Sequence, residues 1–166
     1  MTAIVKINHP ALRQIAKVVD PKTIGTAELN DILKKMSVAL LACDDGVALA
    51  APQIGLPLRI FIVSHRLFDD NDTKDIVFIN PEITRLAKTK VILDEGCLSV
   101  PGSYGKTKRA PKATVTALDE TGRRFTWSGT GLMAQIFQHE TDHLNGILFS
   151  DHATDLKNHF PDEPKI

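Results

Sequence analysis

Five consecutive residues near the C-terminus, His139-Glu140-Thr141-Asp142-His143, form the pattern H-E-x-x-H. Histidines four apart lie one above the other on a helix face, so both imidazoles can reach a single cation. Glu140 points about a quarter-turn away, where it can meet a metal-bound water without being a ligand itself. The pattern predicts a metal-dependent hydrolase. The alternative interpretation is a helix with two core histidines and a surface glutamate.

A catalytic metal site of this kind needs a third protein ligand, and the downstream candidates are poor. The extended metallopeptidase pattern H-E-x-x-H-x-x-G-x-x-H begins correctly with Gly146, but Phe149 stands where its third histidine would be. Other peptidases take a glutamate from a following helix, and Glu163 lies in a proline-flanked tail with no room for one. His152 and His159 stay open as candidates.

A better candidate lies upstream, at Cys97. This residue follows Gly96, which allows the backbone to come close to whatever Cys97 faces. Its alternative is a small buried hydrophobe, which is how we interpret Cys43, inside or just after an amphipathic helix. The residues alone leave both interpretations of Cys97 open.

The expected secondary structure would bring these residues together on a late helix. That helix runs from about Thr130, as N-cap, to Asn145, with Gly146 placed to end it. The apolar Leu132 and Ile136 share the His139 face and form an apolar floor. The earlier elements are a short helix after Pro10, with Leu12 and Ile15 toward the core, and a helix over about Ala27–Ala42.

The middle of the chain is rich in β-forming residues. We expect strands at Leu58–Ser64, Ile76–Asn80 (stopped by Pro81), Lys90–Leu93, Ala113–Asp119, Arg123–Trp127 and Ile147–Ser150, with a polar turn between Asp69 and Lys74. The residues Glu120-Thr121-Gly122 turn one of these pairs into a hairpin. The order of elements predicts an α+β fold, with mixed, mainly antiparallel β-sheets packed around a central metal-binding helix.

Composition narrows the class of protein. The 166 residues fit a single domain, and 20 basic residues balance 20 acidic ones, so no global charge favours nucleic acid or an anionic membrane. No apolar run approaches the length of a membrane span, and the N-terminus lacks a secretory signal. Two cysteines do not make a disulfide scaffold, which favours a cytosolic compartment. A basic cluster at Lys106, Lys108, Arg109 and Lys112 reads as a solvated loop.

Three segments, in this order, resemble the peptide deformylase family. They are Gly46–Gln53 (GVALAAPQ), Glu95–Ser99 (EGCLS) and Gln138–His143 (QHETDH). The resemblance covers most of the chain from the second expected helix, at about Ala27–Ala42, to about residue 150. It implies a peptide deformylase-like fold over residues 1–166 and an enzyme that removes the formyl group from the N-terminal formyl-methionine of nascent polypeptides, releasing formate.

The resemblance also implies roles for individual residues. Cys97, His139 and His143 would bind one divalent metal, natively ferrous iron, with nickel, cobalt or zinc as alternatives. The metal lowers the pKa of its water, and the resulting hydroxide attacks the formyl carbon while Glu140 acts as general base and then acid. The Gln53 side chain and the Leu98 backbone N–H are implied as donors to the developing oxyanion. Glu95 is expected to hydrogen-bond a ligand histidine, and an ion pair of Arg109 with Asp142 to orient the metal helix, the alternative being an ordinary ion pair. The residues expected to contact the substrate are Gly46, Val47, Ala48, Leu93, Leu132 and Ile136.

Two departures from the family pattern concern the substrate and the ribosome. Ala48 replaces a glycine, which costs something if the site needs a positive φ or a close approach. The long C-terminal helix that docks some members on the ribosome is not expected here, so any transient contact would use another surface, such as Lys106–Lys112. We expect no specific nucleic acid or membrane partner, and a place in the cytoplasm or an organelle of bacterial descent.

Two other functions are compatible with parts of the sequence. A metallopeptidase shares the H-E-x-x-H chemistry but needs the downstream ligand discussed above. A non-catalytic metal-binding relative is expected to have lost Glu140 or Gln53, and this chain keeps both.

Overall fold

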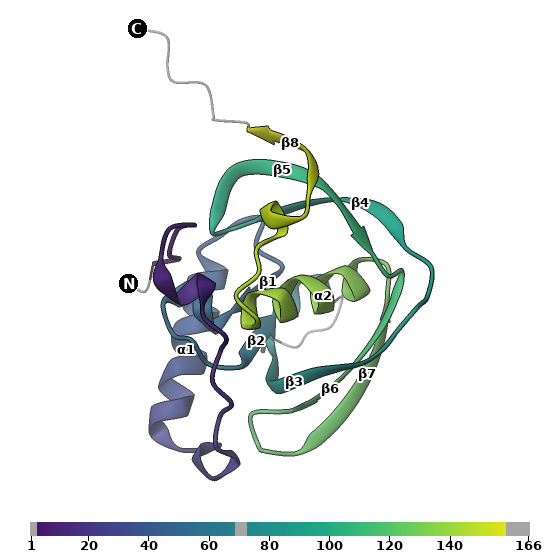
Figure 1. The fold of residues 1–166 in the computed structure, drawn as a ribbon. Coiled ribbons are helices and arrows are strands. Elements are labelled where there is room, and N and C mark those ends of the chain that lie inside the picture. Colours follow the sequence, from purple (N-terminus) through teal and green to yellow (C-terminus); the bar gives the residue numbers. More distant parts are fainter. Residues whose placement is uncertain (1–2, 69–72, 159–166) are drawn as a thin grey trace, which may run out of the picture.

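The computed structural model describes residues 3–68 and 73–158, which form two antiparallel sheets and two α-helices (Figure 1). The five-stranded sheet has the order β1 (Ala48–Ala50), β2 (Ile60–Val63), β3 (Ile76–Leu86), β6 (Lys112–Leu118), β7 (Arg124–Thr130). The three-stranded sheet has the order β4 (Val91–Cys97), β5 (Val100–Arg109), β8 (Thr154–Asn158). The helices are α1 (Ala27–Leu41) and α2 (Leu132–Leu144), and short 3-10 turns are η1 (Pro10–Arg13), η2 (Pro21–Thr23), η3 (Ala51–Ile54), η4 (His65–Leu67) and η5 (Phe149–Asp151). The α+β prediction is confirmed.

The five-stranded sheet separates the two helices. Successive residues of a strand point to opposite faces, and in β2 Ile60 and Ile62 pack with α1 whereas Phe61 packs on the α2 side. There the Phe61 ring stacks on Phe78 at 4.4 Å, and Phe78 meets the Phe137 ring edge of α2 at 5.6 Å. This packing fixes one face of α2 and leaves the opposite face toward the three-stranded sheet.

Both ends of α2 depend on glycine. Gly146 has a φ of +74°, a left-handed conformation that ends the helix as the sequence predicts. At the start, the predicted cap is wrong, because Thr130 is still the last residue of β7. The N-cap is Gly131, with a φ of +55°, which lets the chain turn sharply from the strand into the helix.

The prediction that Pro81 stops a strand is wrong. Strand β3 runs through Pro81 to Leu86, and its pairing with β6 shifts register between Ile79 and Glu82. Asn80 lies at this bulge with a φ of +50°. A bulge leaves a residue out of the hydrogen-bond ladder, so a proline without N–H is tolerated there.

Other predictions at the two ends of the chain are also corrected. Leu12 is buried as expected, but Ile15 is 76% exposed, since η1 ends at Arg13 and the periodicity does not continue. Residues 147–150 form no strand, and Phe149 begins η5. Of the predicted polar turn between Asp69 and Lys74, residues 69–72 lie outside the described residues.

The residues of the basic cluster lie in strands, not in a loop: Lys112 begins β6 and the other three belong to β5. In β5 the residues Lys106 and Lys108 are exposed while Thr107 and Arg109 are buried, a strict alternation. The predicted hairpin of β6 and β7 is confirmed. Within the described residues, no helix is long and apolar enough to cross a membrane.

Candidate active site

The two histidines of the H-E-x-x-H pattern face the end of β4. His139 and His143 lie one turn apart on α2, and their ring centroids are 4.9 Å apart. Cys97 is the last residue of β4, where the register with β5 shifts after Gly96 and a two-residue turn of Leu98 and Ser99 follows. A bulge of this kind re-aims the side chain beside it.

These three side chains fit a metal ion. The Cys97 Sγ lies 3.2 Å from the His143 Nε2, and the potential ligand atoms of Cys97, His139 and His143 all lie within 4.8 Å of one another. Bonds of about 2.0–2.3 Å from one ion would span such a group, and a thiolate with two imidazoles suits several divalent transition metals. Among the residues the structure describes, this is the only cluster of its kind.

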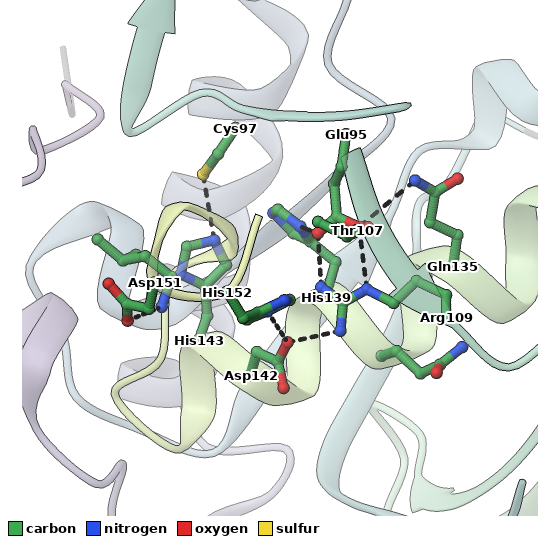
Figure 2. Close-up of polar contacts among 12 residues, drawn as sticks. Glu95, Cys97, Thr107, Arg109, Gln135, His139, Asp142, His143, Asp151 and His152 are labelled. Atoms are coloured by element: carbon green, nitrogen blue, oxygen red, sulfur yellow. Dashed lines mark hydrogen bonds and ion pairs between the residues drawn. The ribbon is translucent and has the colours of Figure 1, made fainter. Parts of the chain in front are cut away.

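The buried Glu95 carboxylate contacts one of the candidate ligands, His139 (Figure 2). Its Oε1 lies 2.6 Å from the His139 Nδ1, while its Oε2 accepts from the Thr107 hydroxyl at 2.6 Å and from the Arg109 Nε at 2.9 Å. Burial alone would raise the pKa of Glu95, but hydrogen bonds from His139 and Arg109 outweigh it and hold that pKa far below its usual range. An ionised Glu95 keeps Nδ1 of His139 protonated and leaves Nε2 free for a metal.

Arg109 connects this carboxylate to the last turn of α2. Its Nη1 donates to the Asp142 Oδ2 at 2.6 Å, which is the contact the sequence led us to expect. His152 contacts the same Asp142 oxygen, with its Nε2 at 3.5 Å. It is not part of the group formed by Cys97, His139 and His143. Arg109 is buried between two carboxylates, and although burial would lower its pKa, the charge and hydrogen bonds of Glu95 and Asp142 raise it.

Glu140 lies beside these groups and has one unpartnered carboxyl oxygen within the described part of the chain. Its side chain is 3% exposed, and Oε2 has no hydrogen-bond partner among the described residues. Burial, with smaller contributions from Glu95 and Asp142, raises the pKa of Glu140 to about 7 against the opposing charges of His139 and Arg109. A carboxyl group with a pKa near neutrality can both accept and deliver a proton at physiological pH.

Gln53 approaches from the five-stranded sheet through η3. Its Oε1 accepts from the Ala50 N–H at 2.8 Å, which leaves Nε2 directed at the Cys97 Sγ (3.5 Å) and the Ser99 hydroxyl (3.3 Å). Leu98 lies in the adjacent turn and lines the cleft. Of the two predicted oxyanion donors, Gln53 therefore contacts Cys97 and Leu98 follows it directly in the chain.

A cleft of about 520 Å³ opens onto these residues. Of the predicted substrate-binding residues, four line it: Val47, Ala48, Leu132 and Ile136. Gly46 and Leu93 are not among its lining residues. Ala48 has no positive φ and lies buried in β1, so its Cβ causes no backbone strain at this position.

Several polar residues of the site were missed by sequence reasoning. Thr107 and Ser99 serve Glu95 and Gln53, and Gln135 donates to the Asp94 carbonyl at 2.9 Å. Gln138 accepts from the Ala110 N–H and donates to the Ala110 C=O, both at 2.9 Å, which fastens α2 to the end of β5. The alternation of exposed and buried residues in β5 was a signal for Thr107. The sequence gives no such signal for Gln135 and Gln138, because a glutamine in a helix is most often solvated.

The chain is similar to known proteins over nearly its whole length. A family model described as Polypeptide deformylase matches residues 1–159. A peptide deformylase of Dehalococcoides mccartyi is 40% identical over 152 residues, which are 90% of this chain and 84% of that protein. Peptide deformylase 1B, chloroplastic/mitochondrial, of Arabidopsis thaliana is 39% identical over 92% of this chain and 54% of its own length. The crystal structure of a peptide deformylase from Legionella pneumophila superposes with a TM-score of 0.82 at 39% identity, covering 92% of this chain and 85% of that one.

Proposed function

Since the chain belongs to the polypeptide deformylase family, whose activity is removal of the N-formyl group from nascent peptides, we propose that Cys97, His139, His143 and Glu140 carry out this reaction here. The observation that carries the proposal is the three grouped ligand atoms beside the buried, unpartnered Glu140 oxygen. The family is metal-dependent, and this cluster is the candidate for its metal.

Cys97, His139 and His143 would hold one divalent ion, which we propose to be ferrous iron, with zinc, nickel or cobalt as substitutes. The bound ion would act as a Lewis acid and lower the pKa of a water to near neutrality. Glu95 supports this arrangement by holding His139 in one tautomer, Arg109 holds Glu95, and Asp142 holds Arg109 in turn.

Glu140 moves the proton. Its free Oε2 accepts a proton from the attacking water, and the resulting neutral acid then delivers it to the nitrogen of the leaving amine. The pKa of about 7 makes both transfers accessible, because neither protonation state is strongly preferred at neutral pH. The low exposure of Glu140 keeps competing bulk water away from this carboxyl group.

The formyl oxygen gains negative charge as the carbon becomes tetrahedral. The Gln53 Nε2 and the Leu98 backbone N–H are our proposed donors to this oxygen. Gln53 is well suited because its Oε1 is fixed by the Ala50 N–H, so Nε2 is held in place before the substrate arrives. Removal of one such donor typically lowers the rate by about 10²–10³.

The methionine side chain of the substrate would enter the apolar part of the cleft, against Val47, Leu132 and Ile136. The substrate backbone would pair as a strand beside residues 46–48, and Gly46 and Leu93 remain proposed contributors at the edge of this region. We expect the chain to act where formylated polypeptides are made, in a bacterial cytoplasm or an organelle of bacterial descent. Transient ribosome contact through the exposed Lys106, Lys108 and Lys112 is a further proposal.

The test is formate release from formyl-Met-Ala-Ser by protein purified anaerobically and loaded with ferrous iron, beside Glu140→Ala. We expect turnover by the wild type, and a loss of about 10²–10⁴ in the variant with metal content unchanged. Internal cleavage of longer peptides without formate release would indicate a metallopeptidase instead. No turnover with one metal bound per chain would indicate a non-catalytic relative.

A further inference from the structure

The strand that carries Cys97 has a free edge at the cleft. In the described part of the chain, β4 is the edge strand of its sheet and pairs with β5 alone. Asp94, Gly96 and Cys97 line the cleft on this side. Backbone groups on such an edge need partners, and an extended peptide is one that fits them.

The side chain of Gln135 hydrogen-bonds to one of these backbone groups. Its Nε2 donates to the Asp94 carbonyl at 2.9 Å and lies 3.5 Å from the Glu95 Oε2 (Figure 2 labels Gln135 beside Glu95). Gln135 stands one turn before His139 on α2, so the two side chains share a face. The helix therefore grips β4 at two successive residues, through Gln135 at Asp94 and through His139 at Glu95.

The alternation of an antiparallel pair tells which groups remain available. Asp94 pairs with Lys106 and Gly96 with Tyr104, two positions apart on both strands. Residues two apart direct their backbone groups to the same side. Because the Asp94 carbonyl is directed at α2, the backbone groups of Gly96 lie on the same free edge, next to Cys97.

We infer that Gln135 is a positioning residue that closes the β4 edge at Asp94 and thereby sets the register of the substrate peptide. This inference rests on the proposed function. Because Gln135 already donates to the Asp94 carbonyl, a peptide strand can pair with the free edge of β4 only at Gly96 and the residues after it. Without Gln135, the same peptide can pair two residues closer to the start of β4, at Asp94, which displaces it by about 6.8 Å. Such a displacement takes the formyl group away from the metal ligands.

The test compares two substrates in Gln135→Leu, which keeps the bulk of the side chain and removes its donor. We expect kcat/KM for formyl-Met-Ala-Ser to fall about tenfold, as for one lost hydrogen bond, and to stay within about twofold for formyl-methionine. Formyl-methionine has no following peptide unit to mispair. The exposed Gln14→Leu serves as the matched control and should leave both values unchanged.

Two further variants complete the design. Gln135→Arg restores an N–H donor and should recover the tripeptide activity. Gln135→Asn has too short a reach for Asp94 and repeats the comparison if the leucine variant does not fold. An equal loss for both substrates, no loss, or a loss that Gln135→Arg does not recover would overturn the inference. Absence of turnover in the wild type itself would instead count against the proposed function.

Discussion

Glu95 is the buried carboxylate around which the hydrogen bonds and the charges of the site are arranged. It accepts hydrogen bonds from His139, Thr107 and Arg109 while it is almost inaccessible to solvent. A buried carboxylate is tolerated only where its oxygens are fully occupied, and Arg109 supplies the compensating charge. His139 therefore has a strong partner on its Nδ1, whereas the buried His143 Nδ1 has none among the described residues. The two candidate histidine ligands are thus unequal in their hydrogen bonding.

This inequality gives a prediction for Glu95→Gln. The amide keeps the shape of the side chain but weakens its hold on His139 Nδ1, so metal affinity should fall about 10–100-fold. Metal titration of the apo protein measures it. The neighbouring Asp94→Asn is the matched control, since that side chain is exposed and paired with Lys106. An unchanged dissociation constant in Glu95→Gln would show that His139 needs no such partner.

At this scale the sequence indicates the candidate ligands but not the residues that hold them in place. Helical spacing alone places His139 and His143 on one face, where both could reach one cation, with Glu140 beside them. Cys97 needs the resemblance, because no local rule distinguishes a thiolate ligand from a small buried hydrophobe. Thr107 and Gln135 are found only in the structure, since their roles arise from contacts across 12 and 41 positions of the chain.

Among the secondary-structure elements, α2 is held by both sheets. Phe137 packs into the five-stranded sheet, and Gln138 is bonded to both backbone groups of Ala110 at the end of β5. The hydrophobic periodicity of α1 and the hairpin of β6 and β7 could be predicted because local residues determine them. Strand β8 could not be predicted, because its polar residues pair only with the outer edge of β5.

Asn80 joins the N-terminal segment to β3. Its side chain accepts from the Val19 N–H and donates to the Val19 C=O, both at 2.8 Å, while its own backbone has the positive φ that asparagine tolerates. Asn80→Ala should therefore lower the free energy of unfolding by about 1–3 kcal/mol, measured by urea denaturation. Asn30→Ala, on the exposed face of α1, should change the free energy of unfolding by no more than about 0.5 kcal/mol. Equal effects of the two substitutions would contradict this role of Asn80.

A bidentate ion pair joins η1 to η5 and makes part of the stability dependent on pH. Arg13 donates to both Asp151 oxygens, at 2.6 and 3.0 Å, and this hydrogen bonding is the main reason why the pKa of Asp151 is lowered. A lowered carboxyl pKa stabilises the fold above the unfolded value of about 3.9, and the contribution is lost as the pH falls through the folded value.

Thermal unfolding of Asp151→Asn tests this dependence. The variant should melt below the wild type at pH 7, and the difference should shrink to nothing well below pH 3.9. The effect is small, because both side chains are more than a third exposed and solvent screens them. Asp44→Asn, in an exposed turn, is the control. If the difference in melting temperature persisted unchanged at acid pH, the substitution would act through the local structure of η5 and not through the charge of Asp151.

For the whole molecule, the candidate metal site joins the three-stranded sheet to the helix that the five-stranded sheet supports. A metal that binds only the folded state adds about 2.7 kcal/mol when its concentration is 100 times its dissociation constant. We therefore expect a chelator to lower the melting temperature of the wild type. Cys97→Ser should melt near the chelated value with or without added metal. A melting temperature that does not respond to the chelator would exclude a stabilising ion.

The fold class could be predicted from the order of strands and one late helix, but the way in which the sheets enclose that helix could not. Pro81 shows the reason. A local rule stops the strand there, yet the bulge at Asn80 carries β3 on to Leu86, where it pairs with β6. Arg109 shows the same at the site, because an arginine in a basic run is buried only when two carboxylates from elsewhere surround it.

Several contacts join residues that lie far apart along the chain, and this separation has a consequence for the kinetics of folding. Cys97 meets His143 across 46 positions, Glu95 meets His139 across 44, and Arg13 meets Asp151 across 138. Contacts between distant segments close slowly and late, because each must overcome the entropy of a long loop. A chain still being synthesised has no metal pocket until α2 has emerged and docked. Metal capture during refolding is therefore expected to follow, with a lag, the burial of the aromatic residues around Phe78.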